Sequence, residues 1–129
     1  LRSSSNLPRH LSPPWQMSAP SLMKLPADSV IDPRKITHYL LIRRDVDDKS
    51  GFLRLAGYEP RHTVRLMEDI RSLLHADAEW VEVSEYAEKF AIHGILTGPN
   101  GRQLRVRSIW ARLHHTREVR FITLYPASS

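Results

Sequence analysis

Cysteine is missing from this sequence of 129 residues. Disulfide bonds, zinc–thiolate sites and thiol nucleophiles are therefore excluded. A chain without cysteine suits a reducing compartment, and we expect a cytoplasmic protein. Long apolar runs are also missing, because no stretch approaches the roughly 20 residues that cross a bilayer. We therefore expect no membrane partner and one domain of ordinary size.

Glycine is scarce, with five residues, and proline is unevenly distributed, since four of its nine residues fall within residues 1–22. The same segment holds six serines and shows almost no periodicity. A segment of this composition does not bury enough apolar surface to offset the entropy of ordering it. We therefore expect a disordered Pro/Ser-rich tail over residues 1–22 and a single domain over residues 23–129.

Acidic residues are nearly absent from the C-terminal third. Residues 89–129 carry seven basic residues and one acidic residue, whereas residues 45–88 carry five basic and eleven acidic residues. The net charge of the whole chain is +5. Either the opposite charges meet within the fold, or the C-terminal third faces a polyanion.

Helical patterns occupy the first half of the domain. Asp32 followed by Pro33 predicts a helix start, because aspartate caps free N–H groups and proline suits the first helical position. A second short helix is predicted near residues 52–56, ended by Gly57 in a left-handed conformation. A third begins at Glu59-Pro60, and we expect its apolar face to be formed by Val64, Met67, Ile70 and Leu74. Residues 43–48 are expected to be a loop, and residues 23–31 an edge strand or an extended arm.

After Ala76 the apolar period changes from that of a helix to two. Strands are predicted at residues 80–83, 90–97, 104–110 and 119–125. Asn100-Gly101 predicts a tight hairpin that pairs Leu96 with the region of Leu104. Short connections favour consecutive antiparallel pairing. The expected fold class is therefore α+β, with about three N-terminal helices packed on a four-stranded antiparallel sheet.

Several short motifs, taken in order, resemble a bacterial domain family of unknown function. They are MKLPADSVIDPRKITHYLL at 23–41, Lys49 with Phe52, Gly57-Tyr58, Tyr86, Lys89-Phe90, LTGPNGR at 96–102, VRSIW at 106–110, Arg120-Phe121, Thr123 and Tyr125-Pro126. Ala87 departs from the pattern, in which glycine is usual. The resemblance implies no assigned activity. The order of helices and sheet is also similar, at the level of fold, to small bacterial ribonuclease toxins.

The basic third predicts a site for phosphate. Arg105 and Arg107 are two residues apart on one strand, so they share a face of the sheet. We expect Arg120 on the next strand to come beside them, within about 5 Å of Arg107 at Cβ, if the register allows. Arginine binds phosphate in a bidentate manner and stays charged. The alternative is that the acidic helix around Glu68 and Asp69 covers these arginines.

Two further side chains are candidates for acid/base chemistry. His93 lies in the middle of a predicted strand, and Glu88 is one of three glutamates near the start of the sheet. With Arg107 and Arg120 they would form a catalytic centre for RNA cleavage that requires no metal and no cofactor. Substrate-binding roles are predicted for Arg105 and for three other side chains, namely Lys89, Trp110 and Tyr125.

Two functions compete at this point. The first is a toxin-like, metal-independent ribonuclease or RNA-binding domain that uses a basic sheet face. The second is a non-catalytic module that pairs with a small neighbouring protein, since no clear acid/base pair is present. A weaker third is a small-molecule domain in which Trp110 and Tyr125 line a pocket, although burial in the core is the commoner fate of such aromatics.

Overall fold

The computed structural model describes residues 22–41 and 49–127 and confirms an α+β fold. Apart from Leu22, the expected tail over residues 1–22 and the expected loop over residues 43–48 lie outside these residues. None of the helices described is long and apolar enough to span a bilayer. The elements in chain order are β2 (Leu22–Met23), α2 (Pro33–Lys35), η1 (Ile36–Leu40), α3 (Ser50–Arg54), η2 (Pro60–His62), α4 (Thr63–Ser72), η3 (Leu73–His75), β3 (Ala78–Val83), β4 (Ala87–Thr97), β5 (Gln103–Leu113) and β6 (Val119–Pro126).

The sheet is antiparallel and its strands follow the order β2-β3-β4-β5-β6. All four predicted strands are present, and β4 and β5 are longer than expected. The two-residue strand β2 adds a fifth. Of residues 23–31 only Met23 belongs to it, and the residues that follow form no strand apart from an isolated bridge at Val30, so the extended arm is the better description. Leu96 pairs with Leu104 across the β4–β5 hairpin, as Asn100-Gly101 predicts.

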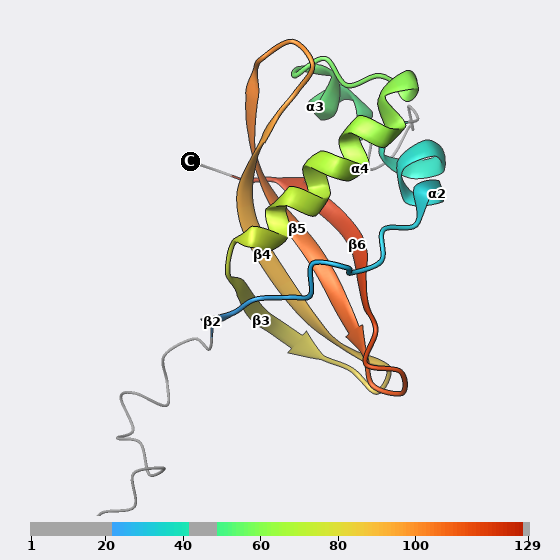
Figure 1. Ribbon diagram of the computed structural model, residues 1–129, viewed down its shortest axis with the longest axis vertical. Coiled ribbons are helices and arrows are strands. Elements are labelled where there is room, and N and C mark those ends of the chain that lie inside the picture. The colour runs from blue at the N-terminus through green and yellow to red at the C-terminus, as the bar shows by residue number, and fades with distance from the viewer. Residues whose placement is uncertain (1–21, 42–48, 128–129) are drawn as a thin grey trace, which may run out of the picture.

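Within residues 22–41 and 49–127 the helices cover only one face of the sheet, and none of them lies on the other face (Figure 1). Pairing between β4 and β5 is unbroken from Ala87↔Leu113 to Thr97↔Gln103, so side chains alternate strictly between the faces. Phe90 and Trp110 belong to the helix-covered face and lie in the core. On the same face a Cβ at Gly94 would approach Leu73 to 2.6 Å, which shows how closely η3 packs on the sheet.

The start of the first helix follows its predicted cap. Asp32 accepts a hydrogen bond from the backbone N–H of Arg34 at 3.0 Å, and Pro33 occupies the first helical position. After three residues the helix continues as the π-helical turn η1. Its apolar side chains Ile36 and Leu40 are fully buried, as their spacing predicts.

The predicted apolar face of the third helix is partly wrong. Val64 is 68% exposed, whereas Leu66, which was not expected to be buried, is completely covered. Ile70 and Leu74 are buried as expected, and Leu73 joins them. Both stripes have helical spacing, so periodicity does not choose between them. Packing against the sheet selects the stripe that contains Leu66.

The tip of the β4–β5 hairpin is attached to α3. Asn100 donates its backbone N–H to the carbonyl of Ala56 at 3.2 Å and its side-chain amide to that of Leu55 at 3.2 Å. Gly57 has the left-handed conformation expected of a helix end, with φ of 89°. The helical N-terminal half of the domain therefore contacts the sheet at the hairpin tip as well as through the core.

At the other edge, β6 is only partly covered. The backbone of Val30 bridges it, accepting from Phe121 N–H and donating to the carbonyl of Val119, both at 2.8 Å. Beyond this bridge no strand among the described residues pairs with the outer edge of β6. The segment α2–η1 lies beside this open part of the strand (Figure 1).

Candidate nucleic-acid interface and adjoining pocket

The sheet face opposite the described helices carries most of the predicted basic residues. The register places Lys89, His93, Arg105 and Arg107 on the same face, and Arg120 joins them opposite Ala111. We call these five residues the basic face. Lys89, Arg105 and Arg107 have no ion pair within the described residues. An uncovered surface of cations without carboxylate partners attracts polyanions.

The acidic helix does not cover the arginines, so this alternative is wrong. Helix α4 packs on the opposite face of the sheet (Figure 1). Asp69 is bound by Tyr58 at 2.5 Å and by Arg65 at 3.2 Å, and Glu68 is exposed. The Tyr58 hydroxyl is desolvated and lies beside the carboxylate of Asp69, and both effects raise the pKa of Tyr58. Part of the negative charge of residues 45–88 is therefore neutralised by a basic residue of the same segment.

Arg107 and Arg120 are not neighbours, which corrects the expected pair. Arg107 pairs with Tyr125, and Arg120 lies opposite Ala111, four residues further along β5. At ~3.3 Å per residue the two positions are about 13 Å apart along the strand. Arg120 also forms an ion pair with Glu118 at 2.7 Å. The two arginines therefore do not hold one phosphate between them, although they share a face.

The two acid/base candidates lie on different faces. His93 is exposed directly opposite Arg107 on the basic face. Glu88 lies on the helix-covered side and binds Arg112 at 2.7 Å. The Arg112 guanidinium lowers the pKa of Glu88 from its ordinary value. A centre containing both His93 and Glu88 is therefore not formed, and a catalytic role of His93 stays a prediction.

Of the two aromatic side chains predicted to bind substrate, one is buried in the core and the other lies on the surface. Trp110 is completely buried, stacks edge-on against Phe121 at 5.3 Å, and donates its indole N–H to Ser108 at 2.9 Å. It is a core residue, and its side chain is not accessible from the surface. Tyr125 is exposed opposite Arg107 and lines a pocket.

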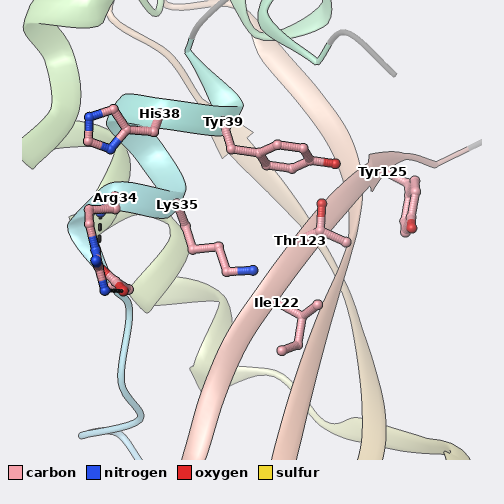
Figure 2. Close-up of a pocket in the computed structure, with 8 residues that line it drawn as sticks. Arg34, Lys35, His38, Tyr39, Ile122, Thr123 and Tyr125 are labelled. Atoms are coloured by element: carbon pink, nitrogen blue, oxygen red, sulfur yellow. Dashed lines mark hydrogen bonds and ion pairs between the residues drawn. The ribbon is translucent and has the colours of Figure 1, made fainter. Parts of the chain in front are cut away.

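This pocket lies between the segment α2–η1 and the open edge of β6, and has a volume of about 630 Å³. We call it the β6-edge pocket. Figure 2 shows Lys35 and Tyr39 extending from the helix towards the strand, with the hydroxyl of Thr123 directed at Tyr39. The lining residues are Asp32, Arg34, Lys35, His38, Tyr39, Ile122, Thr123 and Tyr125.

A buried lysine borders the pocket. Lys49 is only 4% exposed, and its ammonium group donates to the phenol oxygen of Tyr39 at 2.9 Å. The same group lies 5.1 Å from the centre of the Tyr39 ring and 4.5 Å from that of Tyr125. These cation–π contacts hold the two tyrosines on either side of one positive charge.

The carboxylate of the pocket is already neutralised. Arg34 donates to both oxygens of Asp32, at 3.0 and 3.3 Å. These hydrogen bonds lower the pKa of Asp32 to about 2. Lys35 has no ion pair among the described residues and extends into the pocket (Figure 2). The pocket is therefore positively charged.

Sequence reasoning did not select Lys35, Tyr39, Lys49 or Thr123 as functional. All four nevertheless belong to the motifs that carry the family resemblance. The motifs contained these residues, but the spacing of residues along the chain does not predict that residues 35–49 lie next to residue 123. No three His, Asp or Glu side chains in the described part of the chain are grouped as metal ligands would be.

The architecture defines a small α+β domain whose helices cover one sheet face and whose other face is basic. The chain belongs to a family described as a domain of unknown function, DUF6883, whose model matches residues 24–128. The family resemblance of its motifs is thereby confirmed. No curated protein matches the sequence.

The fold is similar to that of a solved contact-dependent growth inhibition toxin–immunity protein complex from Klebsiella pneumoniae 342. The match has a TM-score of 0.55 and 22% sequence identity, and covers 80% of this chain and 97% of that chain. The expected fold-level similarity is thereby confirmed for a protein of a toxin–immunity complex. At this identity the likeness concerns the fold alone.

Proposed function

We propose that this domain binds single-stranded RNA across its basic face. The observation that carries the proposal is that, in the part of the chain the structure describes, no helix covers Lys89, Arg105 or Arg107 and none of the three forms an ion pair. Arg105 is exposed, and Lys89 and Arg107 are half-buried. All three cations therefore keep contact with solvent, where phosphate oxygens can reach them.

The shape of the surface favours a single strand. An open sheet offers a broad platform on which bases are splayed, and an exposed aromatic ring stacks with any base. Tyr125 supplies such a ring next to Arg107. Duplex RNA, in contrast, is contacted mainly through its shape and backbone.

A toxin-like ribonuclease is the finer form of this proposal. His93 is the predicted acid/base residue that lies beside Arg107. In metal-independent cleavage it would take the proton of the ribose 2′-hydroxyl as that oxygen attacks phosphorus. The bond to the 5′-oxygen then breaks, this oxygen takes a proton from water, and a 2′,3′-cyclic phosphate remains. Arg107 would stabilise the charge that develops on the phosphate.

The test measures the affinity for a fluorescent single-stranded RNA at several salt concentrations. If Lys89, Arg105, Arg107 and Arg120 each neutralise one phosphate, the log–log slope is about −2.8. Affinity then falls roughly 50-fold between 50 and 200 mM salt. The double variant Arg105→Gln, Arg107→Gln should reduce the magnitude of the slope by about 1.4.

The matched control is Arg54→Gln, which removes an exposed arginine at the end of α3. It should leave affinity and slope unchanged. Absence of RNA binding by the unaltered protein at low salt would overturn the proposal. Cleavage in the presence of a chelator, lost in His93→Asn while RNA affinity is retained, would establish the ribonuclease form.

A protein partner is the second candidate, because most of the β3 edge has no paired strand within residues 22–41 and 49–127. β2 pairs with only the first two residues of β3. Beyond them Trp80, Val83 and Tyr86 are exposed, with Glu82 and Glu85 among them. A small neighbouring protein with a basic strand fits such an edge.

The partner hypothesis is tested by calorimetric titration with the protein encoded beside this one. Trp80→Ser and Val83→Ser should weaken a complex at this edge at least tenfold. The control Val64→Ser removes an exposed apolar side chain from α4, far from this edge in the sequence. Equal effects of all three variants would exclude docking on β3.

A further inference from the structure

We propose that the β6-edge pocket binds one phosphate group of the RNA strand that crosses the basic face. This inference rests on the proposed function and adds a specific subsite to it. The basic face offers dispersed charges, whereas the pocket offers a concave site in which one phosphate meets a cation and a hydroxyl together.

The cation is Lys35. Asp32 is the carboxylate among the lining residues, and Arg34 occupies both of its oxygens at 3.0 and 3.3 Å. Lys35 is therefore left without an acidic partner in the part of the chain that the structure describes. It extends into the opening between helix and strand (Figure 2). A lysine placed in this way is a point charge for an anion.

The hydrogen-bond donor is Thr123. Its residue is only 7% exposed, and its hydroxyl oxygen has no hydrogen-bond partner within the described residues. A buried hydroxyl without a partner is unfavourable, because it has lost its bonds to water. The hydroxyl is directed towards Tyr39 across the pocket (Figure 2). A phosphate oxygen in this space would accept its proton and relieve the penalty.

The walls are held in place before any ligand binds. Lys49 donates to Tyr39 at 2.9 Å and lies against the Tyr125 ring at 4.5 Å, so both rings are fixed by one buried ammonium group. A pocket of about 630 Å³ lies within the range of small-molecule sites and accommodates a nucleotide. Fixed walls reduce the entropy lost on binding.

The pocket is continuous with the basic face. Tyr125 lines the pocket and pairs with Arg107, and Thr123 pairs with Ile109 in the next position on the same face. An RNA strand that passes Arg107 therefore reaches the pocket by crossing a single strand, β6. This short path links the subsite to the RNA and distinguishes it from an isolated anion site.

The experiment follows backbone amide resonances by NMR while adenosine 5′-monophosphate or inorganic phosphate is added. Both probes should shift the amides of Lys35 and Thr123. Lys35→Gln should weaken the binding of adenosine 5′-monophosphate at least tenfold. Thr123→Val, which removes only the hydroxyl, should weaken it several-fold, and Thr123→Ser should restore it. Circular dichroism establishes that each variant is folded.

The outcomes for pocket and RNA are separable. If the protein binds RNA but Lys35→Gln changes neither RNA affinity nor nucleotide affinity, the subsite is wrong and the proposed function stands. If the protein binds no RNA, the proposed function fails, and with it the assignment of the phosphate to RNA. Shifts confined to Arg105 and Arg107 would also overturn the subsite. Arg54→Gln serves as the control that leaves both affinities unchanged.

Discussion

Ser108 satisfies two polar groups in the middle of the core. Its hydroxyl donates to the carbonyl of Ile92 at 3.0 Å and accepts the indole N–H of Trp110 at 2.9 Å. Both side chains are completely buried. A buried donor that loses its acceptor costs about 1–3 kcal/mol. One hydroxyl thus allows a tryptophan with a polar atom to pack inside the fold.

We therefore expect Ser108→Ala to lower the free energy of unfolding by about 1–3 kcal/mol. Urea unfolding followed by tryptophan fluorescence measures this change. Ser72→Ala is the control, because Ser72 is exposed and bonds only within its own helix. Its effect should stay within about 0.5 kcal/mol. Equal effects would mean that Trp110 finds another acceptor.

Asp32 is a second residue with a measurable signature. Hydrogen bonds from Arg34 lower its pKa from 3.8 to about 2. An NMR titration of the carboxyl group should show this value, and Arg34→Gln should raise it towards 3.8. Because the pKa is depressed in the folded state, the stabilisation is complete above about pH 4 and is lost as the pH falls towards 2.

The control for this titration is again Arg54→Gln, which should leave the pKa of Asp32 unchanged. Titration of Asp32 near 3.8 in the unaltered protein would show that the ion pair with Arg34 does not persist in solution.

At the scale of elements, the hairpin tip and α3 fit together without spare room. A Cβ added at Gly98 would lie 2.1 Å from the carbonyl oxygen of Ala56 and 2.4 Å from its Cβ. Backbone atoms do not rotate away from such a contact. We expect Gly98→Ala to lower the free energy of unfolding by about 1–3 kcal/mol or more.

Gly94→Ala is the matched comparison for this prediction. Its added methyl group would meet only the flexible end of Leu73, at 2.6 Å. A side chain can adjust its rotamer, so Gly94→Ala should cost less than Gly98→Ala in the same urea experiment. The reverse order would show that the tip of the hairpin moves more easily than η3.

The elements also show where sequence patterns are sufficient. The cap at Asp32 and the turn at Asn100-Gly101 are correct because both are determined by neighbouring residues and their backbone conformations. The apolar face of α4 is partly wrong because two stripes of equal spacing pass through the helix. Only the surface of the sheet distinguishes the stripe of Leu66 from that of Val64.

At the scale of the whole molecule, the two faces of the sheet have different electrostatic roles. On the helix-covered side, Arg112 binds Glu88 at 2.7 Å and lies over the ring of Phe90 at 5.1 Å. On the basic face, Arg105 and Arg107 lie two residues apart, and neither has an acidic partner among the residues that the structure describes. Like charges this close repel one another, so we do not expect this pair of arginines to stabilise the fold.

We expect Arg107→Gln to change the free energy of unfolding by less than about 0.5 kcal/mol, or to raise it. Arg112→Gln should lower the melting temperature clearly, because it leaves Glu88 without its partner. Scanning calorimetry of both variants at low salt measures the contrast. A large loss of stability in Arg107→Gln would show that the basic face is structural and would weaken the RNA proposal.

The candidate site was accessible from the sequence only in part. Alternation along one strand placed Arg105 and Arg107 on the same face, and that inference needs only the geometry of a strand. The distance between Arg107 and Arg120 depends on the register of β5 with β6, which shifts between Ile109 and Trp110. No local sequence pattern predicts that shift in register.

The sequence by itself determined the order of helices and strands, the hairpin at Asn100-Gly101 and the basic character of the C-terminal strands. These features follow from local conformational preferences and from the alternation of apolar residues. The tertiary structure decided which sheet face the described helices cover. It also brought Lys35 and Thr123, which lie 88 residues apart in sequence, to opposite sides of one pocket. Such proximity arises only when helix α2 packs beside the edge of β6, because that contact is determined by the shape of the whole core.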